Sequence, residues 1–437
     1  QLDLLMAKNP ICNNYRRINI MKTITYYFSL VASILLALPA VAQAAPECGA
    51  KTGIKATGSP IKVGGIHGNA APGDFSSATD AASAYFDCVN ENGGINGRPI
   101  QYLVENDQWN PELAAQAAAK LIEDENVVAM VGNGSFVEMS VNAPTYKENG
   151  IMAMASACAV SECFESSNIV STNQGPLASS IGAAMYAVEE LNAQNISCIG
   201  LAIPSVGNWS CGAVESYMTS KGLTGSSVLL NPAAPDVNSG LLEAVASGAD
   251  SILVNLPAGL GIAFLGAAQE QDLAAVYSWT SSTPLYDMSV PAALGEYWDG
   301  KIFVSAELTS LDGQGIDNLN WKAVMDAYAD ENDPRDTFSQ SGYLSAKIFV
   351  ETLLSMDAEQ LDDRNAVSDS IKAINDKRSD LMCGPYYVGE ADRHMPNHAG
   401  IVVVNKNGNF EVVRDCFEYE GPYFEPLFST EKALGLR

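Results

Sequence analysis

The sequence predicts an α/β protein with two lobes, each built on a parallel β-sheet. Short apolar runs of the length of buried strands alternate with amphipathic stretches of helical length. This alternation falls into two separate series along the chain, which indicates two α/β lobes. The chain has 437 residues, of which 47% are apolar, so it is long enough to fill two cores.

The first unit of the chain, residues 61–108, contains a strand, a helix and a second strand. A buried strand at 61–66 is followed by a Gly/Asn/Pro loop, a helix that ends at the glycines 93–94, and a strand at 99–106. A helix that returns the chain to a parallel neighbouring strand forms a βαβ unit. The ligand site of such a unit lies beyond the carboxyl ends of its strands.

Two turns of the first series are therefore expected to line a cleft. His67, Gly68 and Asn69 follow the first strand, and residues 107–110 follow the second. A third turn contains Ser135, between a strand end and a helix start, where backbone N–H groups can hold an anion or a carbonyl. Ser135 is either a ligand contact or the N-cap of a tight turn, and both interpretations stay open.

The remaining elements repeat the same rhythm. The first series continues with helices at 111–123 and 137–149 and strands at 127–131, 151–155 and 169–172. The second series has helices at 176–194, 238–247 and 259–271, one that starts near Trp209, and strands at 198–203, 227–230, 250–255, 276–280 and 301–305. Helices at 318–331, 341–355 and 367–377 follow, and the tail 384–413 is expected to form strands around a turn at 405–408.

The N-terminal part of the sequence predicts a secretory signal. A short charged region begins at Met21, residues 26–41 are apolar, and 42–44 form a small-x-small cleavage site. We expect residues 1–44 to be leader and signal, and the mature protein to be free in the periplasm. A retained anchor is disfavoured because Pro39 interrupts the apolar run. We interpret the patternless stretch before Met21 as an extended gene model.

The net charge of −27 argues against a nucleic-acid partner, because binding phosphates requires a basic surface. Removing the leader leaves eight of the nine cysteines, an even number in a chain addressed to an oxidising compartment. Sequence proximity suggests three disulfides and elimination a fourth, although other pairings are open. These pairs are Cys158 with Cys163, Cys198 with Cys211, Cys383 with Cys416, and Cys48 with Cys88.

Neither a metal nor another cofactor is expected. The sequence contains no CxxC motif, and its histidines are His67, His394 and His398. His394 and His398 lie at helical spacing, but the polar and proline-containing residues around them indicate a loop.

An enzyme is disfavoured as well. No GxSxG motif stands beside a plausible histidine partner, no GxxxxGK loop occurs, and residues 64–68 do not fit GxGxxG. Paired carboxylates such as Glu189 and Glu190 lie on expected solvated faces. A hydrolytic enzyme or a ligand sensor on the same two-lobe scaffold remains an alternative.

Several segments together resemble one family. They are the opening strand and loop, residues 90–98 (NENGGINGR), Asn106 with Asp107, the turn 132–135, and residues 382–386 (MCGPY). They resemble the type I periplasmic solute-binding proteins, and within these the branched-chain amino-acid-binding branch of ABC importers. The resemblance covers about residues 60–415 and lies in the order and spacing of these segments.

This resemblance implies two Rossmann-like lobes joined by three crossover segments, near 171–175, 307–311 and 386–391. It implies a monomer that closes on a small-molecule ligand and presents it to an inner-membrane ABC permease with its ATPase subunits. Lobe 1 would comprise residues 45–175 and 309–388, and lobe 2 residues 176–308 and 389–437.

The resemblance also implies positions for the pocket. In amino-acid binders, the turn after the third strand supplies hydroxyl and amide groups to the ligand carboxylate, and Ser135 and Phe136 match that turn. The turn after the fourth strand is matched by residues 156–158, where relatives commonly end with a threonine. A disulfide at Cys158 would remove that hydroxyl contact. Trp209 matches the aromatic residue, usually tyrosine, that opens the first helix of lobe 2.

The positions that hold the ammonium group in amino-acid binders are not acidic here. They are Asn and Gln at 173–174 and Thr and Ser at 280–281. Because a buried cation without a counter-charge costs several kcal/mol, an aromatic or carboxylate/amide compound is favoured over a standard amino acid. Glu307 could replace the missing ammonium-binding acids. Its alternative role is a hydrogen bond at the hinge.

Aromatic and neutral polar residues predominate among the positions expected to face the cleft, which suits a planar or apolar ligand. For each tryptophan, the alternative to ligand binding is ordinary packing. For His67, the alternative is that it is a simple loop residue. The candidate ligand-binding residues are His67, Asn69, Trp109, Ser135, Phe136, Ser156, Ala157, Asn208, Trp209, Asn255, Trp279 and Glu307.

Overall fold

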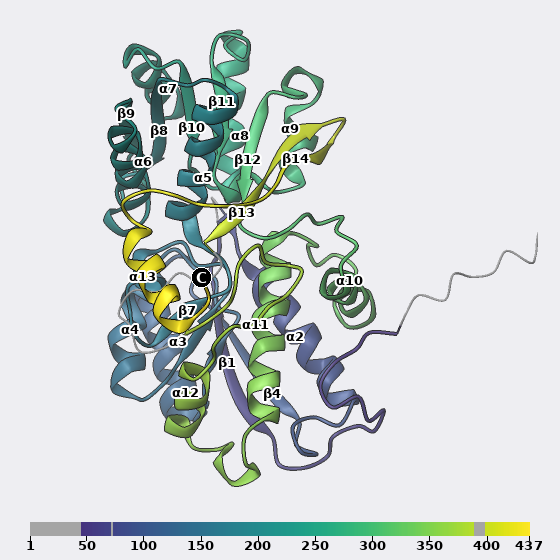
Figure 1. Cartoon of the computed structure of the whole chain (residues 1–437). Helices are drawn as coiled ribbons and strands as arrows, with labels where there is room; N and C mark the ends of the chain where they lie inside the picture. Colours follow the sequence, from purple (N-terminus) through teal and green to yellow (C-terminus); the bar gives the residue numbers. More distant parts are fainter. Residues whose placement is uncertain (1–44, 71–72, 389–397) are drawn as a thin grey trace, which may run out of the picture. The chain divides into compact units, whose positions relative to one another are not determined.

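The computed structural model describes residues 45–70, 73–388 and 398–437. Residues 46–437 form one compact unit, which contains two main β-sheets with helices packed on them (Figure 1). The expected leader and signal, residues 1–44, lie outside the described residues. Within the described ranges, no helix is long and apolar enough to span a bilayer.

The first sheet is parallel, has the strand order β4-β1-β5-β6-β7, and forms the base of lobe 1. The apolar run of β1 is almost wholly buried, as expected for a central parallel strand with both faces covered. In the register of β1 with β4, His67 lies opposite Asn106, so the carboxyl ends of both strands meet at one edge. The strands are β1 (Ile61–His67), β4 (Ile100–Asn106), β5 (Met130–Val131), β6 (Ala153–Ala155) and β7 (Ile169–Ser171).

Helices from two distant parts of the sequence cover this sheet. The later helix α11 packs against α2 so closely that a Cβ atom on Gly342 would lie 1.9 Å from the carbonyl oxygen of Ala78. The chain thus returns to lobe 1 after building most of the second sheet. The helices of lobe 1 are α2 (Ser76–Glu91), α3 (Pro111–Ala119), α4 (Glu138–Glu148), α10 (Ile316–Tyr328), α11 (Thr337–Leu354) and α12 (Arg364–Lys372).

The second sheet, the base of lobe 2, has the order β14-β13-β12-β11-β10-β8-β9. The five earlier strands run parallel, whereas β13 and β14 form an antiparallel hairpin around the expected turn. The strands are β8 (Asn195–Leu201), β9 (Thr224–Leu230), β10 (Ser251–Val254), β11 (Ser278–Ser281), β12 (Ile302–Ala306), β13 (Ala399–Lys406) and β14 (Asn409–Glu418). Its helices are α5 (Gly175–Glu190), α6 (Trp209–Ser220), α7 (Val237–Ala246), α8 (Ala258–Glu270) and α9 (Ser289–Leu294). The predicted α/β class with parallel sheets is confirmed.

Several short elements and two helices, α9 and α13 (Glu425–Leu434), were not expected. Helix α13 follows β14 and contributes Leu427 to an apolar core that also contains residues of both lobes. The short elements are the hairpin of β2 (Asn69–Ala70) and β3 (Gly73–Asp74), the π-helical turns η1 (Lys120–Asp124) and η3 (Pro204–Asn208), and the 3₁₀ turns η2 (Ser161–Cys163), η4 (Thr283–Leu285), η5 (Glu296–Trp298) and η6 (Ala358–Gln360).

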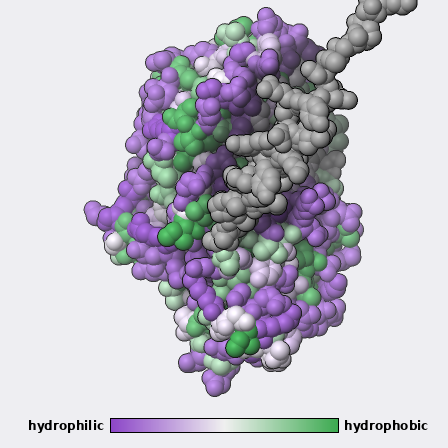
Figure 2. Space-filling view, turned by 90° about the vertical axis from the view of Figure 1, so that its right-hand side faces the viewer, coloured by the Kyte–Doolittle hydropathy of each residue, from purple (hydrophilic) through white to green (hydrophobic). Residues whose placement is uncertain are grey.

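The surface is largely hydrophilic, in keeping with the acidic composition. On the face drawn in Figure 2, polar residues predominate and apolar residues form small separate patches. The structure joins the four cysteine pairs suggested by the sequence, Cys48–Cys88, Cys158–Cys163, Cys198–Cys211 and Cys383–Cys416.

The chain passes between the two sheets three times. The first passage lies between β7 and α5, the second between β12 and α10, and the third between α12 and β13. Part of the third passage, residues 389–397, lies outside the described residues, and with it His394 and part of the expected crossover 386–391.

Candidate functional site

Four aromatic side chains gather at the carboxyl edge of the lobe 1 sheet. We call Phe75, Trp109, Phe136 and Phe338 the aromatic cluster. The ring centroids of Trp109 and Phe136 are 4.6 Å apart, and the ring of Phe75 lies 4.8 Å from those of Phe136 and Phe338 and 5.3 Å from that of Trp109. Phe75 is 4% exposed, whereas the other three rings are half-buried and present part of their surface.

Local backbone structure fixes the Trp109 ring. Gln108 and Trp109 follow β4 with left-handed φ angles of 52° and 59°, and the Trp109 N–H donates to Asp107 Oδ1 at 2.8 Å. The ring lies against Gly68, where a Cβ atom would be 2.2 Å from it. The indole N–H donates to the carbonyl oxygens of Ala70 at 2.6 Å and Gly73 at 3.1 Å, which ties the β2–β3 hairpin to the ring.

The aromatic cluster faces lobe 2. A Cβ atom at Gly73 would lie 3.7 Å from the Phe136 ring and 3.8 Å from Pro257, which precedes α8 of lobe 2. Asn69, at the start of the same hairpin, is exposed, and its backbone N–H donates to Asn106 Oδ1 at 3.1 Å. The hairpin therefore places Trp109, Phe136 and Asn69 at the boundary between the lobes, where the sequence predicted them.

A buried polar network lies beneath the aromatic cluster. The Ser135 hydroxyl donates to Asp107 Oδ2 at 2.5 Å and accepts from the N–H groups of Val137 at 3.1 Å and Glu138 at 3.2 Å. All its hydrogen-bonding capacity is used within the protein, as in the N-cap interpretation. Burial raises the pKa of the Glu138 carboxyl to about 7, against hydrogen bonds from Tyr146 and two asparagines that lower it.

His67 is half-buried at the end of β1. Its Nδ1 lies 2.7 Å from Thr79 Oγ1, and that hydroxyl donates to the carbonyl oxygen of Ser76 at 2.9 Å. Because the Thr79 proton is used, Nδ1 carries the hydrogen of this contact and Nε2 is an acceptor in the neutral ring. Burial lowers the pKa of His67, opposed by the charge of Asp74. A neutral His67 cannot provide a fixed positive charge for a ligand carboxylate.

Carboxyl groups from both lobes lie around the rim. Asp336, which caps α11, accepts from Ser77 Oγ at 2.9 Å and from the Ser339 N–H at 2.8 Å. Burial raises its pKa to about 6, and the charge of Asp287 in lobe 2 acts in the same direction. Burial likewise raises the pKa of Asp80 to about 6, with Asp333 as the next cause. For both carboxyls burial is the largest cause, and neighbouring acidic groups act in the same direction.

The turn after β6 is buried. Ser156 Oγ donates to Ser345 Oγ of α11 at 2.8 Å, so its hydroxyl serves the packing of that helix. Ala157 packs beneath the aromatic cluster in one small apolar core with Phe75. Cys158 has no hydroxyl, and because it is in its disulfide with Cys163 it has no thiol hydrogen to donate either.

The lobe 2 candidates fall into different environments. Asn255 is buried after β10, donates to Ser210 Oγ at 2.5 Å and accepts from Ser282 Oγ at 2.8 Å, so its amide joins the first turn of α6 to the segments that follow β10 and β11. Asn208 is exposed at the end of η3.

The structure does not bring Trp209 or Trp279 to the aromatic cluster. Trp209 stacks on Phe164 at 5.8 Å and meets Tyr423 edge-on, beside a separate surface pocket. Trp279 is 1% exposed and packs edge-on against Trp298 in the core of lobe 2, because its position in β11 turns the ring toward covering helices. The expectation that the Trp279 ring walls the cleft is therefore wrong.

Glu307 lies at the junction of the chain passages, in the alternative role stated for it. It is 2% exposed, and its Oε2 accepts from the N–H groups of Gln174 at 2.8 Å and Gly175 at 3.1 Å, at the start of α5. Burial raises the pKa of Glu307, while these hydrogen bonds lower it. Its carboxylate is thus engaged at the hinge.

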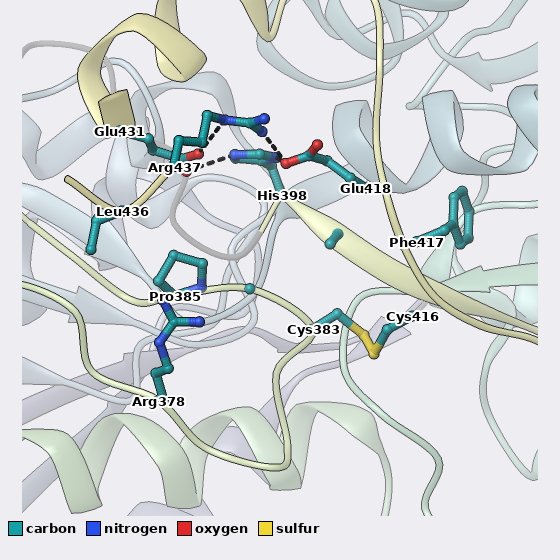
Figure 3. Close-up of a pocket in the computed structure, with 12 residues that line it drawn as sticks. Arg378, Cys383, Pro385, His398, Cys416, Phe417, Glu418, Glu431, Leu436 and Arg437 are labelled. Carbon is teal, nitrogen blue, oxygen red and sulfur yellow. Dashed lines mark hydrogen bonds and ion pairs between the residues drawn. A yellow bond between two sulfur atoms is a disulfide. The ribbon is translucent and has the colours of Figure 1, made fainter. Parts of the chain in front are cut away.

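One group of side chains has the composition of a metal site. His398 lies in the loop that directly precedes β13, is 4% exposed, and its Nε2 lies 2.6 Å from Glu431 Oε1 (Figure 3). His398, Glu418 and Glu431 have ligand atoms within 4.8 Å of one another. However, the guanidinium of Arg437 binds both carboxylates, at 3.1 Å from Glu431 Oε2 and closely at Glu418. Because this side chain already supplies the cation, the arrangement fits an ion-pair cluster better than a metal centre.

Sequence reasoning missed Phe75, Phe338 and the buried acid Glu138. Phe75 directly precedes α2 after a loop, which is a signal of a position at the edge of the sheet. Phe338 comes from a helix more than two hundred residues later in the chain, and no local pattern links it to Trp109.

The sequence profile of the periplasmic binding protein family matches residues 60–409. This chain belongs to that family. No curated protein sequence matches it.

Solved structures of similar fold extend over nearly the whole of this periplasmic binding protein. A solute-binding protein of an ABC transporter from Rhodopseudomonas palustris HaA2, in complex with p-hydroxybenzoic acid, is 18% identical with a TM-score of 0.71, covering 84% of this chain and 99% of that one. A possible leucine/isoleucine/valine-binding protein from Rhodopirellula baltica SH 1 is 13% identical with a TM-score of 0.70, covering 81% and 96%. A fatty acid ABC transporter substrate-binding protein from Thermomonospora curvata is 17% identical with a TM-score of 0.69, covering 85% and 95%.

Proposed function

We propose that this binding protein closes its two lobes on a small organic solute with an aromatic ring, as the periplasmic component of an ABC importer. The observation that carries this proposal is the aromatic cluster, which faces lobe 2 from the carboxyl edge of the lobe 1 sheet. Half-exposed rings at such an edge offer stacking and edge contacts to a planar ligand. The relative from Rhodopseudomonas palustris HaA2 was solved with p-hydroxybenzoic acid, which supports the same ligand class.

The charges around the rim limit the choice within that class. Asp336 caps α11 two residues before Phe338 of the aromatic cluster, and the charge of Asp287 in lobe 2 acts on it. A negative potential disfavours an anion at this rim. Amides, phenols and other uncharged aromatic compounds are therefore favoured, and an aromatic carboxylate requires that its charge point away from these aspartates.

A second candidate is an amino acid or another amine. Its support is the pair Asp336 and Asp287, which comes from opposite lobes and would offer a counter-charge to an ammonium group on closure. Neither aspartate lies at positions 173–174 or 280–281, which hold no acid in this chain.

The partners proposed for the loaded protein are an inner-membrane permease and its ATPase subunits. The proposed compartment is the periplasm, and the proposed free form is a monomer. The four disulfides support an oxidising compartment.

A thermal-shift screen of residues 45–437 tests the ligand class. A ligand that binds the folded state raises Tm according to RT ln(1 + [L]/Kd). We expect increases in Tm with aromatic amides, phenols or aromatic acids. In Phe136→Leu, the apparent affinity for such a ligand should fall at least about tenfold. Phe303→Leu, which changes a half-buried ring of β12 far along the other sheet, is the matched control. Shifts with amino acids or amines alone would replace the aromatic proposal by the second candidate.

A further inference from the structure

We propose that the Cys383–Cys416 disulfide is a fourth, covalent connection at the hinge, which limits how far the two lobes move relative to each other. The inference rests on the lobe movement of the proposed function. It concerns the range of that movement rather than the identity of the ligand.

The three ordinary connections already meet at one residue. The side-chain amide of Gln174 donates to the carbonyl oxygen of Glu307 at 3.0 Å and to that of Ala399. Gln174 belongs to the first passage between the sheets, Glu307 follows β12 in the second, and Ala399 ends the third at β13. All three residues are buried, so lobe rotation is expected to pivot near this point.

The disulfide connects the lobes beside that pivot. Cys383 follows Leu381 and Met382, which are buried in the core of lobe 1, whereas Cys416 lies in the edge strand β14 of lobe 2. Their Cα atoms are 5.3 Å apart although they are 33 residues apart in sequence. The bond therefore bypasses the third passage, and Ala399 lines the same pocket as both cysteines (Figure 3).

Further contacts hold the strand end that carries Cys416. Glu418, two residues later, pairs with Arg437, and His398, directly before β13, bonds Glu431 of α13. The lobe 2 side of the disulfide is thus attached to a rigid hairpin instead of a free loop. Any rotation that would carry Cys383 away from β14 is limited by this covalent bond.

The matched comparison is between two disulfides. Cys383→Ser/Cys416→Ser removes the bond between the lobes, and Cys48→Ser/Cys88→Ser removes one whose cysteines both lie in the core of lobe 1. Amide hydrogen exchange of the N–H groups of Gln174 and Gly175 reports opening of the pivot, and solution X-ray scattering reports the radius of gyration. Both are measured without ligand, so a failure to find a solute leaves this test intact.

We expect exchange at Gln174 and Gly175 at least about tenfold faster, and a broader range of radii, in the hinge variant but not in the lobe 1 variant. Equal exchange in both variants would overturn the proposal. If the hinge variant does not fold, the folded wild-type protein is reduced with a phosphine. Each disulfide then takes two electrons from the phosphine, the phosphine gains the oxygen of a water molecule, and two thiols result. Faster exchange that coincides with the appearance of the Cys383 thiol supports the proposal, and unchanged exchange once that thiol has formed refutes it.

Discussion

Two hydrogen bonds join Gln174 and Glu307. In each of them, the backbone of one residue binds the side chain of the other. The Gln174 N–H donates to the Glu307 carboxylate at 2.8 Å, and the Gln174 side-chain amide donates to the Glu307 carbonyl oxygen at 3.0 Å. The pair joins the segment that enters lobe 2 to the segment that leaves it. The Glu307 carboxylate, at the first turn of α5, also interacts favourably with the positive end of the helix dipole.

Removing the Glu307 carboxylate should destabilise the whole protein. In Glu307→Ala, the buried N–H groups of Gln174 and Gly175 lose their acceptor, so we expect the free energy of unfolding to fall by about 2–4 kcal/mol. Glu307→Gln keeps one acceptor oxygen and should lose less. Urea unfolding of both variants measures the difference, and an alanine variant within about 0.5 kcal/mol of wild type would contradict this account of the hinge.

The buried carboxyl of Glu138 predicts a pH dependence of stability. Its pKa in the folded state, about 7, lies above the ordinary value of 4.5 for a glutamate, so the folded protein binds more protons than the unfolded chain between these values. Stability must therefore fall as pH rises from about 5 to 8, by at most about 3 kcal/mol from this group. The raised pKa values of Asp80 and Asp336, both about 6, add to the same slope.

The Glu138→Gln variant separates this contribution. It keeps a partner for the Tyr146 hydroxyl and does not ionise, so the difference in unfolding free energy between pH 5 and pH 8 should shrink. Glu112→Gln, on the exposed first turn of α3, is the control of equal charge change. The same pH slope in wild type and Glu138→Gln would show that the buried acid does not titrate in this range.

A methyl group at Gly68 should displace the Trp109 ring. The Cβ atom would lie 2.2 Å from a ring that is held by two hydrogen bonds, so Gly68→Ala is expected to cost about 1–3 kcal/mol and to change tryptophan fluorescence. Gly266→Ala, in α8 with no heavy atom within 4 Å of the added Cβ, should instead be neutral or slightly stabilising. Similar losses in both variants would show that the close contact at Gly68 is not the cause.

The Cys198–Cys211 disulfide should stabilise the start of α6. It closes a loop with a sequence separation of 13 residues, for which chain entropy predicts about 3 kcal/mol. Replacing both cysteines by alanine should lower the free energy of unfolding by this order and increase the mobility of Trp209, seen as lower fluorescence anisotropy. Titration of several free thiols in the unfolded wild-type protein would contradict the pairing itself.

The sequence predicted the strands and helices well where apolar runs are long and uninterrupted. β1 matches because a buried parallel strand has an almost wholly apolar sequence. β4, the edge strand of this sheet, is only partly buried and matches because turn residues bound it on both sides. β5 was predicted as the longer strand 127–131, of which Met130–Val131 form the strand. The hairpin of β2 and β3 lacks such a pattern, since two residues of pairing leave no periodicity. Helix α13 was missed because a single tail segment carries little evidence of what it packs against.

The candidate site was predicted in part, for a different reason. Trp109 and Phe136 were found because the ends of parallel strands share one edge of a sheet. Trp279 was misplaced because a strand buried on both faces gives no alternation that tells which way a ring points. Phe338 joins the cluster through the packing of α11 on α2, and such contacts are invisible to a reading of local segments.

The order in which the cores are completed has a consequence for how this chain is made. α11 contributes Tyr343 and Phe349 to the core of lobe 1, and Leu427 of α13 belongs to a core shared by both lobes. A chain that emerges N-terminus first must therefore keep the apolar surfaces of its first two hundred residues uncovered until the last third has followed. During that interval the half-made sheets are prone to aggregate, and a chaperone that delays their collapse would raise the yield of folded protein.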